Sequence, residues 1–198
     1  MKLPSPGPHG KISVEEAISK RRSVRRFRAQ SLSLIQLSQL LWSAQGITGT
    51  GGRRAVPSAG ATYPLEVFVA VGEHGVENLY AGIYHYEVDG HSLSLHLRGD
   101  LRQKLAEVAL SQSFVANCPV DIVICALYPR TAYRYGRRAE RYVHMEVGHV
   151  GQNISLQALA LGLATVMVGA FEDEEVRKIL KIEEQIKPLY IIPVGKPV

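Results

Sequence analysis

The sequence lacks any long hydrophobic run. No apolar stretch in its 198 residues reaches the roughly 18 residues that a membrane-spanning helix needs, so we expect no membrane partner. The N-terminus, which carries prolines at positions 4, 6 and 8, also lacks the apolar h-region of a secretory signal. Because proline disfavours helix, we expect residues 1–12 to form a disordered lead to one domain that spans residues 13–198.

Cysteine is scarce as well. The two cysteines, Cys118 and Cys125, flank an apolar segment that is typical of a buried strand. An extended strand between these positions separates the two thiols by about 23 Å, which is too far for a disulfide. We therefore expect two free thiols in a reducing compartment, and this predicts a cytoplasmic location.

The usual signatures of metal enzymes, hydrolases and nucleotide-binding loops are also missing. His144 and His149 do not have the i, i+4 spacing of a helical zinc site, and no C-x-x-C pair or serine-centred nucleophile elbow occurs. The glycine cluster at 49–52 follows a predicted helix and has no Lys-Ser/Thr ending, unlike a phosphate-binding loop. These absences argue against all three classes, and we expect no bound metal.

Positive charge is what the sequence has in excess, with a net charge of +5 and an isoelectric point near 9.3. The cations crowd two stretches: Lys20, Arg21, Arg22, Arg25, Arg26 and Arg28, and then Arg134, Arg137, Arg138 and Arg141. Such clusters fit nucleic acid, an anionic ligand or a merely solvated basic face. Nucleic acid is the remote alternative, because no recognition motif occurs and aromatic residues do not interleave with the basic clusters.

Hydrophobic periodicity and turn signals predict an α+β fold without repeats or linkers. Capping boxes begin helices at Ser13 and Ser33, and Asp89-Gly90 marks a hairpin turn. The predicted helices span about 14–22, 34–44, 100–110, 139–163 and 173–181. The predicted strands span 65–71, 79–88, 91–97, 119–127, 165–168 and 189–194, and the strand at 119–127 is the most apolar and therefore central.

The predicted helix 139–163 carries an apolar stripe and, beside it, a ridge of small residues. The ridge comprises Gly148, Gly151, Ser155 and Gly162. Each glycine inside a helix costs about 1 kcal/mol relative to alanine, so a close approach of another chain segment must compensate. The ridge is compatible with packing against the domain's own sheet and, equally, with helix packing across a dimer axis.

Two further segments could contact a ligand. Arg21-Arg22-Ser23-Val24-Arg25 offers guanidinium and hydroxyl donors that match a phosphate, although it could also be a solvated helix end stabilised by the macrodipole. Pro57-Ser58-Ala59-Gly60-Ala61-Thr62-Tyr63-Pro64 is a compact loop that would let a planar ring lie against backbone. Alone, it could equally be a tight structural turn.

Taken in order along the chain, these segments resemble the nitroreductase-like flavoproteins, in particular the branch of azoline (thiazole/oxazole-forming) dehydrogenases. The matching segments are 21–27, 57–66, 160–171 and 192–197, so the likeness covers nearly the whole chain after residue 12. The resemblance implies a mixed, mostly antiparallel central sheet flanked by helices, with a long central dimer helix. It also implies FMN as cofactor and a homodimer as the working assembly.

The resemblance also assigns residues to the FMN site. Arg21, Ser23 and Arg25 match the positions that hold the phosphate and ribityl chain, and Arg22 lends a further contact. Pro57, Ser58, Ala59 and Gly60 match the loop beside the isoalloxazine ring, while Met167, Val168, Gly169 and Ala170 match the segment that lines its N5 edge. Lys196 is the one cation near the place where relatives with long C-terminal arms supply more. No protein acid or base is assigned.

The implied activity is a two-step hydride transfer from NAD(P)H to FMN and then to an electron-poor acceptor, with the protein binding and orienting the cofactor. The alternative is an azoline-type dehydrogenase that passes electrons from FMN to oxygen. Such dehydrogenases use a catalytic Lys-Tyr pair, which this sequence does not display clearly, although Tyr133, Tyr135 and Tyr142 lie in the corresponding region.

Overall fold

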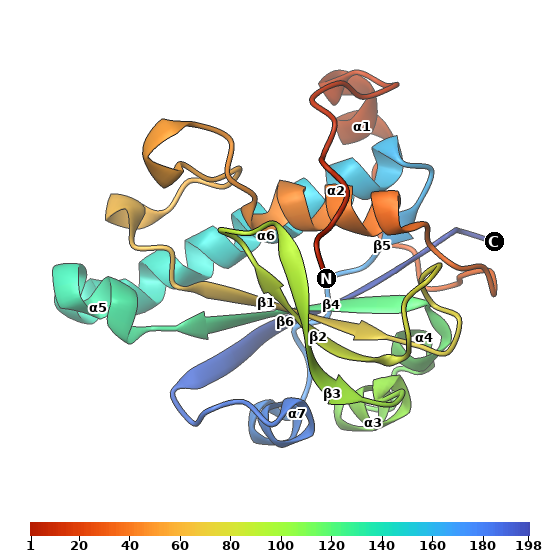
Figure 1. Ribbon diagram of the computed structural model, residues 1–198. Coiled ribbons are helices and arrows are strands. Elements are labelled where there is room, and N and C mark those ends of the chain that lie inside the picture. The colour runs from red at the N-terminus through yellow and green to blue at the C-terminus, as the bar shows by residue number, and fades with distance from the viewer.

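The computed structural model describes residues 1–198 and is built on one six-stranded sheet (Figure 1). The strand order is β3-β2-β1-β4-β6-β5, and every pairing between these strands is antiparallel. The bounds are β1 Leu65–Val71, β2 Gly82–Glu87, β3 Ser92–Arg98, β4 Val120–Leu127, β5 Ala164–Thr165 and β6 Ile186–Gly195. Parallel direction occurs only in isolated bridges such as Ser23 with Thr165. The α+β prediction is therefore confirmed.

Helices cover both faces of the sheet. The α-helices are α1 Val14–Lys20, α2 Leu34–Gln45, α3 Arg102–Val108, α4 Ser113–Asn117, α5 Pro129–Tyr135, α6 Ala139–Ala160 and α7 Asp173–Leu180, and the 3-10 turns are η1 Thr50–Gly52, η2 Ala59–Ala61 and η3 Gly136–Arg138. The larger core cluster joins one sheet face to α2 and α6, and the smaller joins the other face to α3, α4 and α7. Strand β4 lies between β1 and β6 and is almost wholly buried, as its continuous apolar run predicts.

Helix α6 keeps its predicted start but ends earlier than predicted. Val143, Val147, Val150, Ile154 and Ala158 form the buried stripe. Gly162 lies beyond the helix with φ of +70°, and the Leu163 N–H bonds to the Ala158 carbonyl at 2.8 Å, which is the Schellman pattern of a helix end. Placing Gly162 inside the helix was therefore wrong, because periodicity alone does not reveal a positive φ.

The two glycines inside α6 have different surroundings. A Cβ added at Gly151 would lie 3.2 Å from the Met167 sulfur and 3.4 Å from the Tyr190 ring, whereas one at Gly148 would meet nothing within 4 Å. Gly151 therefore serves packing within the chain. Gly148 leaves an open, exposed spot on the helix surface.

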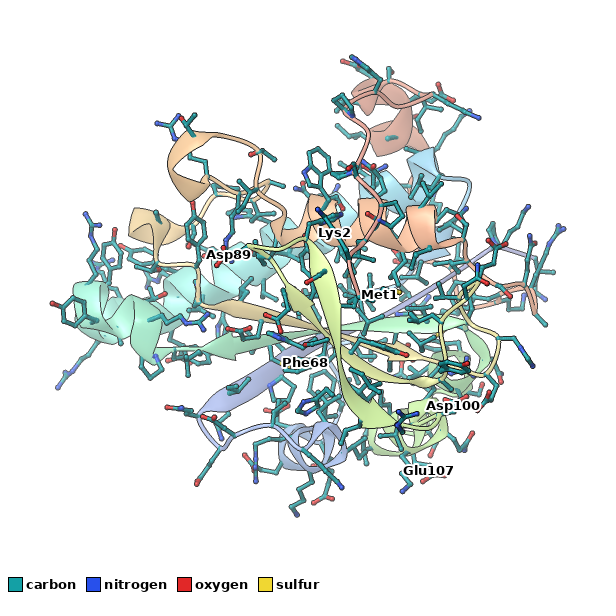
Figure 2. The ribbon with its side chains drawn as sticks, in the orientation of Figure 1. Met1, Lys2, Phe68, Asp89, Asp100 and Glu107 are labelled. Carbon is teal, nitrogen blue, oxygen red and sulfur yellow. The ribbon has the colours of Figure 1, made fainter.

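The first residues lie along the hairpin rather than away from the domain (Figure 2). Lys2 pairs with Ser92, the Leu3 N–H bonds to the His91 carbonyl at 3.0 Å, and Leu3 is buried. Residues 2 and 3 are held in this place because the apolar side chain at position 3 belongs to the larger core. None of the helices is long and apolar enough to cross a membrane.

Candidate cofactor-binding site

The basic tract begins where α1 ends. Ser13 caps the helix start, its hydroxyl accepting from Glu16 N at 3.1 Å, and Arg21 is the C-cap residue. The tract then runs beside β5, since the Val24 N–H bonds to the Thr165 carbonyl at 3.0 Å and Ser23 forms a bridge with Thr165. This pairing fixes the backbone that carries Arg21, Ser23 and Arg25.

The C-terminal segment returns to the same tract. The Arg28 N–H bonds to the Lys196 carbonyl at 2.9 Å, and Phe27 pairs with Pro197. Lys196 is exposed. Neither Lys196 nor the arginines at 21, 22 and 25 forms an ion pair with a carboxylate, although the Arg22 guanidinium bonds to two local carbonyls. The tract thus presents cations that the protein itself does not neutralise.

The 167–170 segment lies at the edge of the same region. Val168 and Ile191 exchange two backbone hydrogen bonds of 2.9 and 3.0 Å, which hold the segment against β6. Val168 is buried, Met167 is half-buried against Gly151, and Gly169 and Ala170 are exposed. Two exposed backbone positions therefore follow directly after an anchored one.

Two side chains beside this region escaped the sequence analysis. The Gln112 amide donates to the Ala170 carbonyl at 3.3 Å, and the Phe114 ring lies 5.9 Å from the Arg25 guanidinium. Phe114 lies in the short helix α4 and Gln112 is its N-cap residue; the five residues of α4 give no periodic signal, and its start has no side-chain cap. The only available signal was the interruption between the predicted helix 100–110 and the strand that follows.

The loop 57–60 is held by its own hydroxyl and by α5. The Ser58 hydroxyl accepts from the Tyr63 N–H at 3.0 Å, and an Arg134 nitrogen donates to the Gly60 carbonyl at 3.2 Å. Gly60 has φ of +59°, and a Cβ there would lie 2.6 Å from the Tyr135 hydroxyl. Only glycine satisfies both conditions. Pro57 is exposed and Ala59 half-buried, so the loop presents small groups and backbone to its surroundings.

Behind this loop lies a buried polar pair. Gln45 and Glu146 are 0% and 2% exposed, and neither Gln45 Nε2 nor Glu146 Oε1 has a hydrogen-bond partner. Burial raises the pKa of Glu146, and the neighbouring Ser58 and Gln45 side chains and the Arg54 charge offset only part of this rise. This environment therefore disfavours the charged form of Glu146 relative to a carboxyl in water.

One chain does not bring all the predicted site residues together. Arg21, Ser23, Arg25, Met167 to Ala170 and Lys196 gather around β5 and β6, whereas Pro57 to Gly60 lie beside α5 and the start of α6. Figure 1 shows α1 and β5 on one side of the molecule and α5 on the other. No hydrogen bond joins the two groups, so one chain presents the predicted site residues in two separate places.

The six-stranded antiparallel sheet with helices on both faces defines a class of protein, and the comparisons agree on it. The nitroreductase family model matches residues 18–196, and the chain belongs to the nitroreductase family. It is 48% identical over 187 residues to a nitroreductase-type protein of Methanocaldococcus jannaschii, covering 94% of this chain and 92% of that one. This family membership makes the protein an oxidoreductase.

Two solved structures show the same fold. A nitroreductase-type protein of Ralstonia eutropha is 28% identical with a TM-score of 0.87, covering 100% of this chain and 89% of that chain. A chain of the Escherichia coli microcin synthetase McbBCD complex, with truncated pro-MccB17 bound, is 25% identical with a TM-score of 0.75, covering 100% and 78%. The nitroreductase-like fold expected from the resemblance is confirmed, and the likeness extends to the azoline branch.

Proposed function

We propose that the protein is an FMN-dependent oxidoreductase that passes electrons from NAD(P)H to an electron-poor acceptor of the nitro or quinone type. The observation that carries this proposal is the group of unneutralised cations, Arg21, Arg25 and Lys196, beside the exposed backbone of Gly169 and Ala170. Guanidinium donors without an acidic partner suit a phosphate monoester, and FMN carries one.

The residues present fit this cofactor. Arg21, Ser23 and Arg25 would hold the phosphate and ribityl chain, with Arg22 and Lys196 adding positive charge. The loop from Pro57 to Gly60 would lie against the ring, because its small side chains and its glycine permit close approach. Met167 to Ala170 would line the edge at which hydride arrives. FMN, when bound, supplies the hydride chemistry, and the protein orients it and tunes its potential.

The separation of these two groups, which we call half-sites, supports a homodimer as the active form. A second copy related by a two-fold axis would present its 57–60 loop to the basic tract of the first copy. The first copy would present its own loop to the tract of the second in the same way. Four of the large apolar side chains that are more than half exposed lie on α1, α2 and α6 and would be covered in such a dimer; they are Val14, Ile18, Ile35 and Met145.

A second candidate function is an azoline-type dehydrogenase that passes electrons from FMN to oxygen. It is favoured by the position of Tyr135, whose hydroxyl lies against Gly60 of the 57–60 loop, which we call the ring loop. The likeness to the microcin synthetase chain also favours it. Arg134, not lysine, precedes this tyrosine. A tyrosine hydroxyl at this place could hold or move a proton beside the ring.

Stopped-flow absorbance of the purified protein tests both candidates. We expect a yellow protein that releases FMN on heating and is bleached by NADPH or NADH within a turnover. A colourless protein, or release of FAD, would contradict the proposal. Bleaching by neither nicotinamide, together with reoxidation by oxygen after reduction with dithionite, would favour the dehydrogenase.

A further inference from the structure

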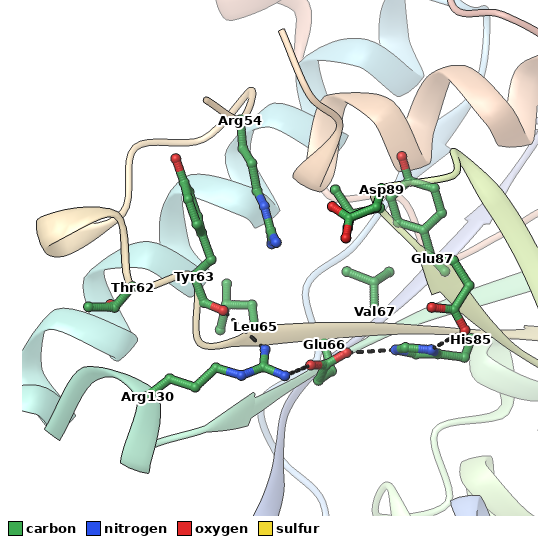
Figure 3. Close-up of a pocket in the computed structure, with 12 residues that line it drawn as sticks. Arg54, Thr62, Tyr63, Leu65, Glu66, Val67, His85, Glu87, Asp89 and Arg130 are labelled. Atoms are coloured by element: carbon green, nitrogen blue, oxygen red, sulfur yellow. Dashed lines mark hydrogen bonds and ion pairs between the residues drawn. The ribbon is translucent and has the colours of Figure 1, made fainter. Parts of the chain in front are cut away.

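A cavity of about 450 Å³ opens between β1 and β2 where their pairing ends (Figure 3). The last paired residues are Phe68 and His85. Beyond them, Leu65 to Val67 pair only with β4, and Tyr86 and Glu87 pair only with β3. We call this cavity the β1–β2 pocket. Its size is that of a small-molecule site.

Most of the charge on its walls is compensated within the protein. Glu66 lies between His85 Nε2 at 2.6 Å and Arg130 at 2.5 Å, while His85 Nδ1 contacts Glu87 at 3.0 Å. The hydrogen bond to Glu66 raises the pKa of His85. Burial alone would raise the pKa of Glu66, but His85 and Arg130 together lower it. In this row of ion pairs, the positive charges of His85 and Arg130 are already paired with carboxylates of the protein.

Arg54 is different, because it faces the pocket without a carboxylate partner. Its guanidinium lies 4.3 Å from the centroid of the Tyr63 ring, and Nη1 donates to Gln45 Oε1 at 2.8 Å. The buried Gln45 fixes the guanidinium from behind, and Tyr63 fixes its plane. A guanidinium has five N–H donors, so most of those on Arg54 remain available to a ligand.

We propose that the β1–β2 pocket binds the carboxylate of a small organic acid, with Arg54 as its anchor. A planar guanidinium fork matches a carboxylate, and Leu65, Val67 and Val88 supply apolar surface for the body of the acid. Asp89, which has no ion-pair partner, lies across the pocket from Arg54 in Figure 3 and opposes a second anionic group. A monocarboxylate therefore fits, and a polyanion such as a nucleotide does not.

The pocket also adjoins the ring loop, since Thr62 and Tyr63 line it directly after residues 57–61. Resting on the proposed function, this position makes the acid the electron acceptor, oriented by its carboxylate. Arg54 is then a specificity-determining residue. It takes no part in electron transfer itself.

A matched pair of acceptors tests this assignment in the holoenzyme. With 4-nitrobenzoate and its methyl ester, we expect Arg54→Gln to raise KM for the acid about tenfold or more, the effect of losing a charge-assisted hydrogen bond, with kcat changed less. For the ester, KM should change less than about twofold, because no carboxylate interaction is lost. Arg53→Gln, a neighbouring exposed arginine outside the pocket, is the control and should leave both compounds unaffected.

Calorimetric titration with benzoate gives a readout independent of turnover. Wild-type protein should bind benzoate, Arg54→Gln should weaken binding about tenfold or more, and Asp89→Asn should tighten it because an opposing charge is removed. If Arg54→Gln fails to fold, Arg54→Lys keeps the charge and loses the fork, and should weaken binding as well. Benzoate binding that is absent, or equal in wild type and both Arg54 variants, overturns the proposal. If benzoate binds through Arg54 but neither nitro compound is reduced, the proposed function fails while the carboxylate site stands.

Discussion

At the scale of single residues, the first prediction concerns how the arginine tract binds FMN. Each of Arg21→Ala and Arg25→Ala should weaken FMN binding by about 1.5–3 kcal/mol, the range for hydrogen bonds to charged groups, because neither side chain has an acidic partner to release. Titration of apoprotein with FMN measures the effect. Arg98→Ala, an exposed arginine on β3, is the control. Unchanged affinity for FMN in both variants would mean that the tract is a solvated helix end and does not bind the phosphate.

A second prediction at this scale concerns Glu146 and the pH dependence of the free energy of unfolding. Because burial raises its pKa in the folded state, the folded protein binds this proton more tightly than the unfolded chain does. The stabilisation is complete below the unfolded pKa of about 4.3 and is lost as pH rises through the raised folded pKa. Arg54 is the charged group that acts on this carboxyl, and Ser58 and Gln45 are its polar neighbours.

Urea unfolding at a series of pH values tests this. The difference in unfolding free energy between wild type and Glu146→Gln should change with pH above about 4.3 in the direction that disfavours wild type. Glu140→Gln, which replaces an exposed glutamate on the same helix, is the matched control. A constant difference for Glu146→Gln would mean that this carboxyl is ionised in the folded protein.

These two residues show what a sequence does and does not disclose. Arg21 and Arg25 could be predicted as anion ligands because guanidinium chemistry needs no tertiary context to be recognised. Glu146 could not, because its burial depends on α2 and the 57–63 loop, which are distant in the sequence. The same holds for Arg54, whose unpaired state is evident only once Gln45 and Tyr63 lie beside it.

At the scale of elements, the glycines around α6 give a matched pair. Gly148 has a helical backbone and open space, whereas Gly162 has φ of +70°. Gly148→Ala should stabilise the protein by up to about 1 kcal/mol through helix propensity, and Gly162→Ala should destabilise it by a similar or larger amount because alanine resists a positive φ. Chemical denaturation compares them. Equal effects of the two substitutions would mean that the Schellman end does not constrain Gly162.

Strong local patterns explain why most elements were predicted within a few residues. The β1 bounds agree fully, and the Asp89-Gly90 turn does join β2 to β3. The elements that were missed, α4 and α5, have five and seven residues and no side-chain cap at their start, so neither periodicity nor a capping signal reveals them. The β1–β2 pocket was missed for another reason, since the end of a strand pairing is a property of two segments together.

At the scale of the whole molecule, the proposed dimer needs a probe that acts only between chains. Gly151→Leu is unsuitable, because its side chain would strike Met167 and Tyr190 of the same chain and so destabilise the fold itself. Gly148→Leu avoids this, since nothing within the chain lies near that position. Any loss it causes would therefore arise from a second copy.

We expect Gly148→Leu to weaken the dimer and FMN binding together while the unfolding temperature of the apo chain is kept. The reason is linkage: if the ring loop of one chain completes the phosphate half-site of the other, flavin binds only the associated form, and dissociation releases it. Light scattering measures the mass of the particle, and absorbance measures the amount of bound flavin. Both are recorded as a function of protein concentration. Gly148→Ala, which adds only a methyl group, should remain a dimer. A wild-type monomer that keeps its flavin would overturn the shared site. A Gly148→Leu dimer with full flavin would place the interface on another face, and the apolar surface of α1 is the next candidate to test.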